Sequence, residues 1–104
     1  MRIAITGANS SVGQAFLDYL LNQADNDIAV NAGVRTQAAA DTLPGHPFIT
    51  PYLIQYRDNA SLDHLLDGAN CVVHLAGILI ESSSSSYQSA NVDATCAVVE
   101  AAQR

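Results

Sequence analysis

The sequence predicts an α/β fold, in which short strands of a parallel sheet alternate with helices. Runs rich in Val, Ile and Leu recur along the chain, and stretches with helical spacing or helix-capping residues separate them. The last of these runs, Cys71–Leu75, is apolar on both faces, as is typical of a buried parallel strand. We expect the strand order 3-2-1-4, with helices on both faces of the sheet.

Length and composition limit the number of domains and the classes of partner. The 104 residues, 49% of them hydrophobic, suffice for a single domain over 1–104. A formal net charge of −6 disfavours non-specific nucleic-acid binding, and no apolar run approaches the roughly 20 residues of a membrane span. Cys71 and Cys96 lack metal-ligand spacing, so no metal is expected, and both thiols are predicted to be buried and reduced in a cytoplasmic protein.

The elements follow in chain order. The first strand is Arg2–Ile5, and the next helix is expected to face inward through Val12, Ala15, Phe16, Tyr19 and Leu20. Turn residues at 25–27 and a low-complexity loop at 82–86 interrupt the pattern. The strands after the first are predicted over 28–34, 52–56 and 71–75, and the helices over 11–21, 37–42, 61–66 and 87–103.

The turn after the first strand predicts a phosphate site. It leads directly into a helix, whose free N–H groups and dipole favour an anion. Ser10 or Ser11 can also cap that helix. A strand, a Gly-containing turn and a helix in this order form the nucleotide-binding unit of a Rossmann-like fold. The residues expected to bind phosphate are Gly7, Asn9, Ser10, Ser11 and Val12.

Three motifs resemble those of the short-chain dehydrogenase/reductase superfamily. Thr6–Gly13 resembles T-G-x-x-G-x-x-G, with Ser10 in place of the middle glycine, where a side chain requires a negative φ. Val72–Gly77 is similar to the V-V-x-H-L-A-[AG] motif of the extended and atypical branches, which include sugar-nucleotide epimerases. Ala90–Thr95 is similar to the N-V-x-G-T start of their fourth helix. The resemblance covers Ile3–Ala102.

This resemblance implies roles for further residues. The backbone of Leu75, Ala76 and Gly77 would pass beside the cofactor ribose, and Asn91 would help to hold the active-site backbone and a water. Asp58, with its neighbour Asn59, would face the adenine; capping of the following helix is the alternative role, and both can hold. His74 is expected to be a packed core histidine rather than a catalytic base.

Arg35 bears on the choice of cofactor. It ends the second strand, where an arginine accommodates the 2′-phosphate of NADP and an acid would bind the ribose of NAD. No acidic residue stands between Ile28 and Asp41. We therefore expect NADP(H) in preference to NAD(H); the alternative is a solvated surface arginine.

The superfamily's catalytic Tyr-x-x-x-Lys is missing. The sequence contains no lysine, so no catalytic residue is assigned and the tyrosines are expected to pack or to lie on the surface. We expect the nucleotide-binding portion of a longer NADP(H)-dependent reductase or epimerase/dehydratase-like protein, truncated relative to the family fold and inactive alone. The alternatives are a non-catalytic redox sensor similar to the NmrA-like regulators, and a structural module without a ligand. An unpaired edge on the fourth strand would favour a homo-oligomer.

Overall fold

The computed structural model describes residues 1–23, 27–76, 86 and 88–104. Gly77, Tyr87, most of the expected turn at 25–27 and most of the expected loop at 82–86 lie outside the described residues. The elements, in order, are β1 Arg2–Thr6, α1 Ser11–Leu21, β2 Ala29–Val34, α2 Gln37–Asp41, β3 Ile49–Leu53, α3 Asn59–Leu66, β4 Cys71–His74, a π-helical segment Gln88–Asp93, and α4 Ala94–Gln103.

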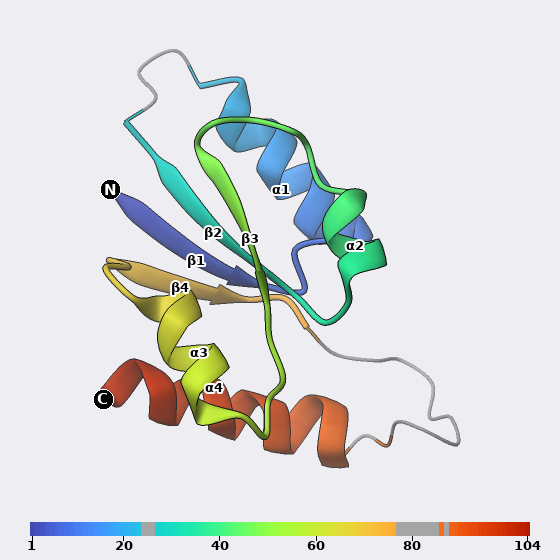
Figure 1. Cartoon of the computed structure of the whole chain (residues 1–104), viewed down its shortest axis with the longest axis vertical. Coiled ribbons are helices and arrows are strands. Elements are labelled where there is room, and N and C mark those ends of the chain that lie inside the picture. Colours follow the sequence, from blue (N-terminus) through green and yellow to red (C-terminus); the bar gives the residue numbers. More distant parts are fainter. Residues whose placement is uncertain (24–26, 77–85, 87) are drawn as a thin grey trace.

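The four strands form one parallel sheet in the order β3-β2-β1-β4, as predicted (Figure 1). Ile5, near the end of β1, pairs with Ala32 of β2 and with Val73 of β4. The carboxyl ends of the strands therefore meet at one end of the sheet, where a doubly wound fold binds its ligand.

Helices cover both faces of the sheet (Figure 1). One core lies under α1 and α2, where Leu17 and Leu20 pack against Ile3 and Ile5. The other lies under α3 and α4, where Leu62 and Leu65 pack with Ala4, Ile54 and Ala101. Successive residues of β1 thus point into opposite cores, as the two-residue repeat of a strand requires.

The predicted inward face of α1 is confirmed only in part, at Leu20, which is buried, and Phe16, which packs against the core. Gly13, Leu17 and Leu20 are buried, whereas Val12 and Tyr19 are 64% and 60% exposed. Apolar residues occur on nearly every side of this helix, so their spacing alone left its rotation undetermined. The turn fixes it: a Cβ at Gly13 would lie 2.5 Å from the carbonyl oxygen of Ala8, so this side of the helix rests on backbone.

The third strand begins earlier than predicted, at Ile49 instead of Tyr52, and contains Pro51. The main chain of this edge strand bonds to β2 at Phe48, which accepts from Val30 N–H, and at Ile54, which donates to Val34. Successive residues of a strand direct their N–H and C=O groups to opposite sides. Pro51 is an odd number of residues from both Phe48 and Ile54, so its N–H position faces away from β2. Its missing N–H therefore lies on the open side of the edge strand, where proline is tolerated.

Asn31 is a fully buried polar residue in β2 that the sequence analysis did not single out. Its Nδ2 donates to the carbonyl oxygen of Leu65 at 2.7 Å, and its Oδ1 accepts from Arg2 Nη1 at 2.7 Å. It therefore ties the last turn of α3 to the sheet and satisfies a carbonyl that has no partner within the helix.

Two further expectations need correction. Cys71, the first residue of β4, and Cys96, on the outer side of α4, are both exposed. The last helix is α-helical only from Ala94; the preceding Gln88–Asp93 has π-helical turns. Within the described ranges, no helix has the length and apolarity needed to cross a membrane.

Candidate functional site

The turn after β1 packs backbone against backbone with the end of β4. Gly7 has φ of +64°, a conformation that favours glycine. A Cβ at this position would lie 2.8 Å from the nitrogen of Ala76 and 2.9 Å from the carbonyl carbon of Leu75. Ala8 N–H also donates to the carbonyl oxygen of Gly33 at 3.2 Å. The turn is therefore held between the ends of β2 and β4.

Ser10 stabilises the same turn and is the N-cap of α1. Its hydroxyl accepts from Gly13 N–H at 3.0 Å and donates to the carbonyl oxygen of Gly7 at 2.8 Å. With φ of −67°, Ser10 meets the conformational requirement for a side chain here. The cap leaves the N–H groups of Ser11 and Val12 without an acceptor inside the helix, as at any α-helix N-terminus.

A cleft of about 340 Å³ opens at the carboxyl ends of the strands. Asn9 and Arg35 both line it, one from the turn after β1 and the other from directly after the end of β2. The cleft is lined by Gly7, Asn9, Ser10, Gly33, Val34, Arg35, Thr36, Ala39, Tyr56, Leu75 and Ala76. Four segments far apart in the sequence thus converge on one hollow of the size that a small-molecule site requires.

The cleft brings together half of the residues predicted to bind the cofactor. Gly7, Asn9, Ser10, Arg35, Leu75 and Ala76 line it. Ser11 and Val12 lie at the adjoining N-terminus of α1 and are exposed. Asn91 lies in the π-helical segment and is not among the lining residues. Gly77 lies outside the described residues.

Asp58 caps α3, which is the alternative role that the sequence left open. Its carboxylate accepts from the N–H groups of Ala60 and Ser61, at 3.1 Å and 3.4 Å. Asn59 is the first residue of the helix. Neither Asp58 nor Asn59 is among the residues that line the cleft; the side chain that reaches it from this connection is Tyr56.

Tyr56, which lines the cleft, and His74, which does not, form a half-buried pair. Their rings meet edge to face, with centroids 6.2 Å apart. Burial raises the pKa of the Tyr56 phenol above its usual 10.0, against the opposing influence of the Thr6 side chain and the Arg35 charge. Burial also lowers the pKa of His74 below 6.5. From the sequence, Tyr56 was predicted only to pack or to lie on the surface. No residue near it in the chain indicates that it faces Thr6, which lies 50 positions earlier.

His74 is half-buried, and both of its ring nitrogens are hydrogen-bonded; it belongs to neither of the two core clusters, and its expected structural role stays a prediction. Its Nδ1 lies 2.6 Å from the Thr6 hydroxyl, and its Nε2 lies 3.0 Å from the Thr95 hydroxyl. The resemblance to known motifs selected the segments that carry His74 and Thr95, but it gave no sign that the two side chains meet.

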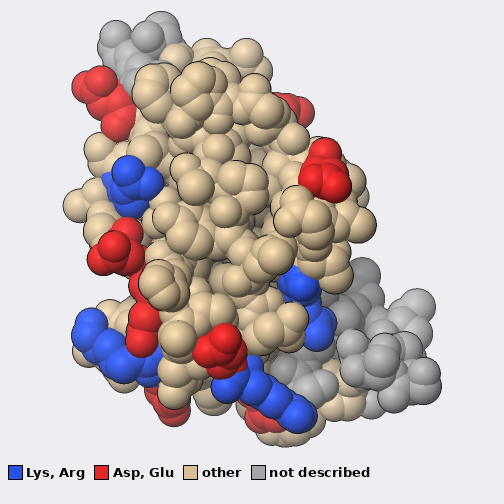
Figure 2. Space-filling view, viewed as in Figure 1, with Lys and Arg blue, Asp and Glu red and all other residues tan. Residues whose placement is uncertain are grey.

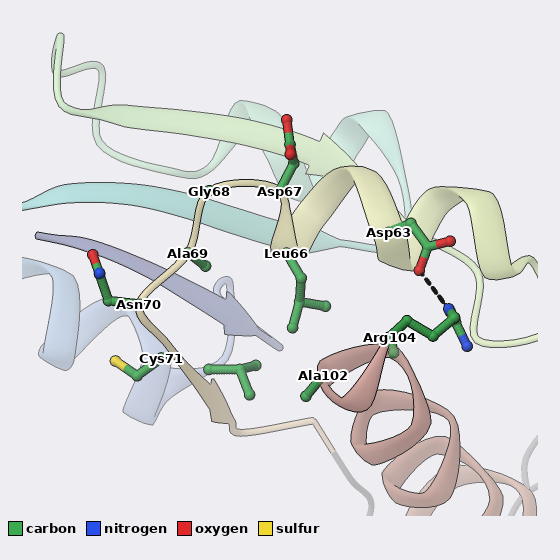
Figure 3. Close-up of a pocket in the computed structure, with 11 residues that line it drawn as sticks. Asp63, Leu66, Asp67, Gly68, Ala69, Asn70, Cys71, Ala102 and Arg104 are labelled. Carbon is green, nitrogen blue, oxygen red and sulfur yellow. Dashed lines mark hydrogen bonds and ion pairs between the residues drawn. The ribbon is translucent and has the colours of Figure 1, made fainter.

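A larger hollow of about 520 Å³ lies away from the cleft, between the α3–β4 connection and the end of α4 (Figure 3). The guanidinium of Arg104 bonds to Asp63 across it, at 2.6 Å from Nη2 and 2.9 Å from Nε. Its other lining residues include the exposed Cys71. None of the predicted cofactor residues lies in it, and its one described cation is already paired, so we place the candidate site in the cleft.

The face shown in Figure 2 is largely uncharged, with acidic and basic side chains interspersed rather than gathered by sign. No broad positive surface is visible on this face. Within the cleft and at its edge, the groups that favour an anion are Arg35 and the N–H groups at the adjoining N-terminus of α1.

Solved structures of enzymes in complex with NAD share this fold. The NAD complex of UDP-glucuronic acid 4-epimerase from Bacillus cereus matches all of this chain with a TM-score of 0.79 and 21% identity, and this chain covers 36% of that one. Uronate dehydrogenase from Agrobacterium tumefaciens, as the NAD complex of a Y136A mutant, matches 98% of this chain with a TM-score of 0.76 and 20% identity; 36% of that chain is covered. The WbmH enzyme of Bordetella bronchiseptica gives the same TM-score, 0.76, at 21% identity.

One curated protein and one family model also match this chain. Fatty acid hydroxylase uhd1 of Mycosarcoma maydis is 33% identical over 86% of this chain, and the chain spans 33% of that protein's length. The family model described as NAD(P)H-binding matches residues 7–104, which contain the turn, Arg35 and the end of β4. This chain therefore belongs to the NAD(P)H-binding family.

Proposed function

We propose that the cleft binds NADP(H) in preference to NAD(H), and that the chain is the nucleotide-binding portion of a short-chain reductase or sugar-nucleotide epimerase/dehydratase-like protein. The single observation that carries the proposal is the position of Arg35 in the same cleft as the turn and Ser10, the N-cap of α1. A guanidinium there is suited to the 2′-phosphate, and the N–H groups of the turn to the pyrophosphate.

The other cofactor residues follow from the same pose. Gly7, Asn9 and Ser10 form the wall on which the pyrophosphate would lie, with Ser11 and Val12 at the helix terminus beside it. Leu75 and Ala76 would border the ribose next to the nicotinamide, with Gly77 continuing that segment. Contacts of Asp58 and Asn59 with the adenine, and of Asn91 with the active-site backbone, stay predictions.

Calorimetric titration with NADPH and NADH at equal ionic strength tests the proposal. We expect tighter binding of NADPH, and we expect Arg35→Ala to weaken it by roughly 10-fold to 100-fold, the effect of losing a charge-assisted hydrogen bond. NADH affinity should change little. Arg57→Ala is the matched control, because Arg57 is exposed and does not line the cleft.

Two results would contradict the proposal. Equal affinities for the two nucleotides, both insensitive to Arg35→Ala, would refute the phosphate preference. The absence of heat from either nucleotide, with the protein shown to be folded, would refute nucleotide binding in this cleft.

Hydride transfer would require residues that this sequence does not contain. The chain has no lysine for the superfamily's Tyr-x-x-x-Lys and spans about a third of the length of the relatives it matches. We propose that the reductase or epimerase chemistry belongs to a longer parent. The missing lysine also fits the alternative, a non-catalytic NADP-binding redox sensor, and assay of the full-length gene product for NADPH oxidation with carbonyl and sugar-nucleotide substrates distinguishes the two.

The open edge of β4 supports a further proposal, self-association through that strand. Within the described residues β4 pairs only with β1, and Cys71 is exposed on it. Sedimentation over a range of concentrations should show an oligomer. Cys71→Lys should weaken it by placing a charge on the edge, and Cys96→Lys, on the exposed side of α4, is the matched control. A concentration-independent monomer would contradict this proposal.

A further inference from the structure

Thr6 links the ends of β1 and β4 through its side chain as well as through the backbone hydrogen bonds of the sheet. Its side chain is fully buried. Its hydroxyl lies 2.6 Å from His74 Nδ1 and 3.4 Å from Ala76 N–H, and its carbonyl oxygen accepts from Leu75 N–H at 3.2 Å. One residue thus contacts three consecutive residues of the segment that leads into the cleft wall.

The Thr95 hydroxyl contacts the other ring nitrogen of His74, Nε2. Its hydroxyl donates to the carbonyl oxygen of Asn91 at 2.5 Å, which is the ordinary way for a helical threonine to use its proton. The same oxygen lies 3.0 Å from His74 Nε2, so it accepts from an Nε2–H. Nδ1 then has no proton and accepts from the Thr6 hydroxyl. The contacts therefore select the neutral Nε2–H tautomer.

The segment that these contacts hold, His74–Ala76, packs against the turn after β1 that contains Gly7. The backbone of Leu75 and Ala76 approaches Gly7 so closely that no Cβ fits between them. Both residues also line the cleft. A shift of a few tenths of an ångström at the end of β4 would alter the distance between this wall and the turn.

We propose that His74 is a positioning residue for the nucleotide cleft, linking Thr6 of β1 to Thr95 of α4 and thereby fixing the backbone of Leu75 and Ala76 against the turn. The inference rests on the proposed nucleotide binding. Through His74, α4 influences a cleft that it does not itself line. His74 acts on the ligand only through the backbone that follows it, so it is not a catalytic residue.

The first test uses substitutions at Thr95, because this residue is exposed and its replacement should leave the fold intact. Thr95→Val removes the hydroxyl with a similar shape and a similar helix propensity. We expect about fivefold weaker binding of NADPH, the equivalent of one hydrogen bond. We also expect faster hydrogen exchange at the amide of Ala76 without any nucleotide. Thr95→Ser should restore both, and Cys96→Ala, at the next exposed position, should change neither.

The second test observes the tautomer directly. A long-range ¹H–¹⁵N spectrum of the free protein should show neutral His74 with its proton on Nε2, and Thr95→Val should shift the Nε2 signal. A proton on Nδ1 would overturn the proposal. So would unchanged affinity and unchanged Ala76 exchange in Thr95→Val. Wild-type protein that binds neither nucleotide would refute the proposed function and this inference with it, whereas wild-type binding that Thr95→Val leaves unaltered refutes the positioning role alone.

Discussion

Substitution of Gly7 by alanine tests the close approach on which the cleft depends. The added Cβ would lie 2.8 Å from the nitrogen of Ala76 and 2.9 Å from its Cα, in a residue with φ of +64°. The left-handed conformation costs a non-glycine residue about 1–2 kcal/mol. Forcing an extra methyl group against backbone adds about 1–3 kcal/mol. The free energy of unfolding should therefore fall by about 2–5 kcal/mol.

Two other glycines separate these contributions. Gly68 also has a positive φ, +72°, but a Cβ there would meet only the Arg2 side chain at 3.8–3.9 Å. Gly68→Ala should therefore show the conformational cost alone. A Cβ at Gly45 would have no heavy atom within 4 Å, and this residue has no positive φ, so Gly45→Ala measures the effect of alanine on the unfolded chain.

Urea denaturation of the three variants, without nucleotide, provides the measurement. We expect the loss of stability to increase from Gly45→Ala through Gly68→Ala to Gly7→Ala. For a domain of this size each kcal/mol corresponds to about 4–8 °C in Tm, so thermal unfolding should show the same order. If Gly7→Ala costs no more than Gly68→Ala, the turn does not pack against the end of β4 as described.

Three further predictions concern caps and protonation. Ser10→Ala should lower the free energy of unfolding by about 1 kcal/mol by removing the N-cap of α1, whereas Ser11→Ala should have little effect; circular dichroism during denaturation checks this. Asp58→Ala should cost about 1 kcal/mol at the start of α3, and Asp58→Asn, which can still cap, should cost less; equal losses would argue against the cap. Burial lowers the pKa of His74 below 6.5, so the unfolded chain binds more protons in this range and stability should fall as the pH drops below about 6.5. The difference in stability between wild type and His74→Gln should follow that pH dependence, and a difference independent of pH would contradict it.

The sheet order, the Gly-containing turn after β1 and its cap were all predictable, the turn and the cap because their causes are local. Ser10, Gly7 and Gly13 lie within seven positions of one another, and the bonds that join them span three residues. The alternation of strands and helices then restricts the topology to right-handed parallel connections. The capping role of Asp58 was likewise visible, since the N–H groups that donate to its carboxylate follow closely along the chain.

What sequence reasoning missed depends on residues that are far apart in the chain. Asn31 could be buried only because Leu65, 34 positions later, offers a carbonyl oxygen. The rotation of α1 followed from the backbone beneath Gly13 rather than from its apolar pattern. Cys71 is exposed although it begins an apolar strand, β4, at the edge of the described sheet. Patterns along one element do not contain these contacts.

The negative net charge of the chain explains why the proposed affinity for a nucleotide depends strongly on the geometry of the cleft. With a formal net charge of −6, the protein as a whole repels a dinucleotide phosphate. Among the described residues that line the cleft, Arg35 alone is charged, and the remaining attraction comes from N–H dipoles at the turn, which act over short distances. Dipoles of this kind lose their effect when they are misdirected by a small shift. The contacts that hold the turn, from Gly7 against Ala76 to His74 between two threonines, should therefore add to the affinity that we propose Arg35 provides.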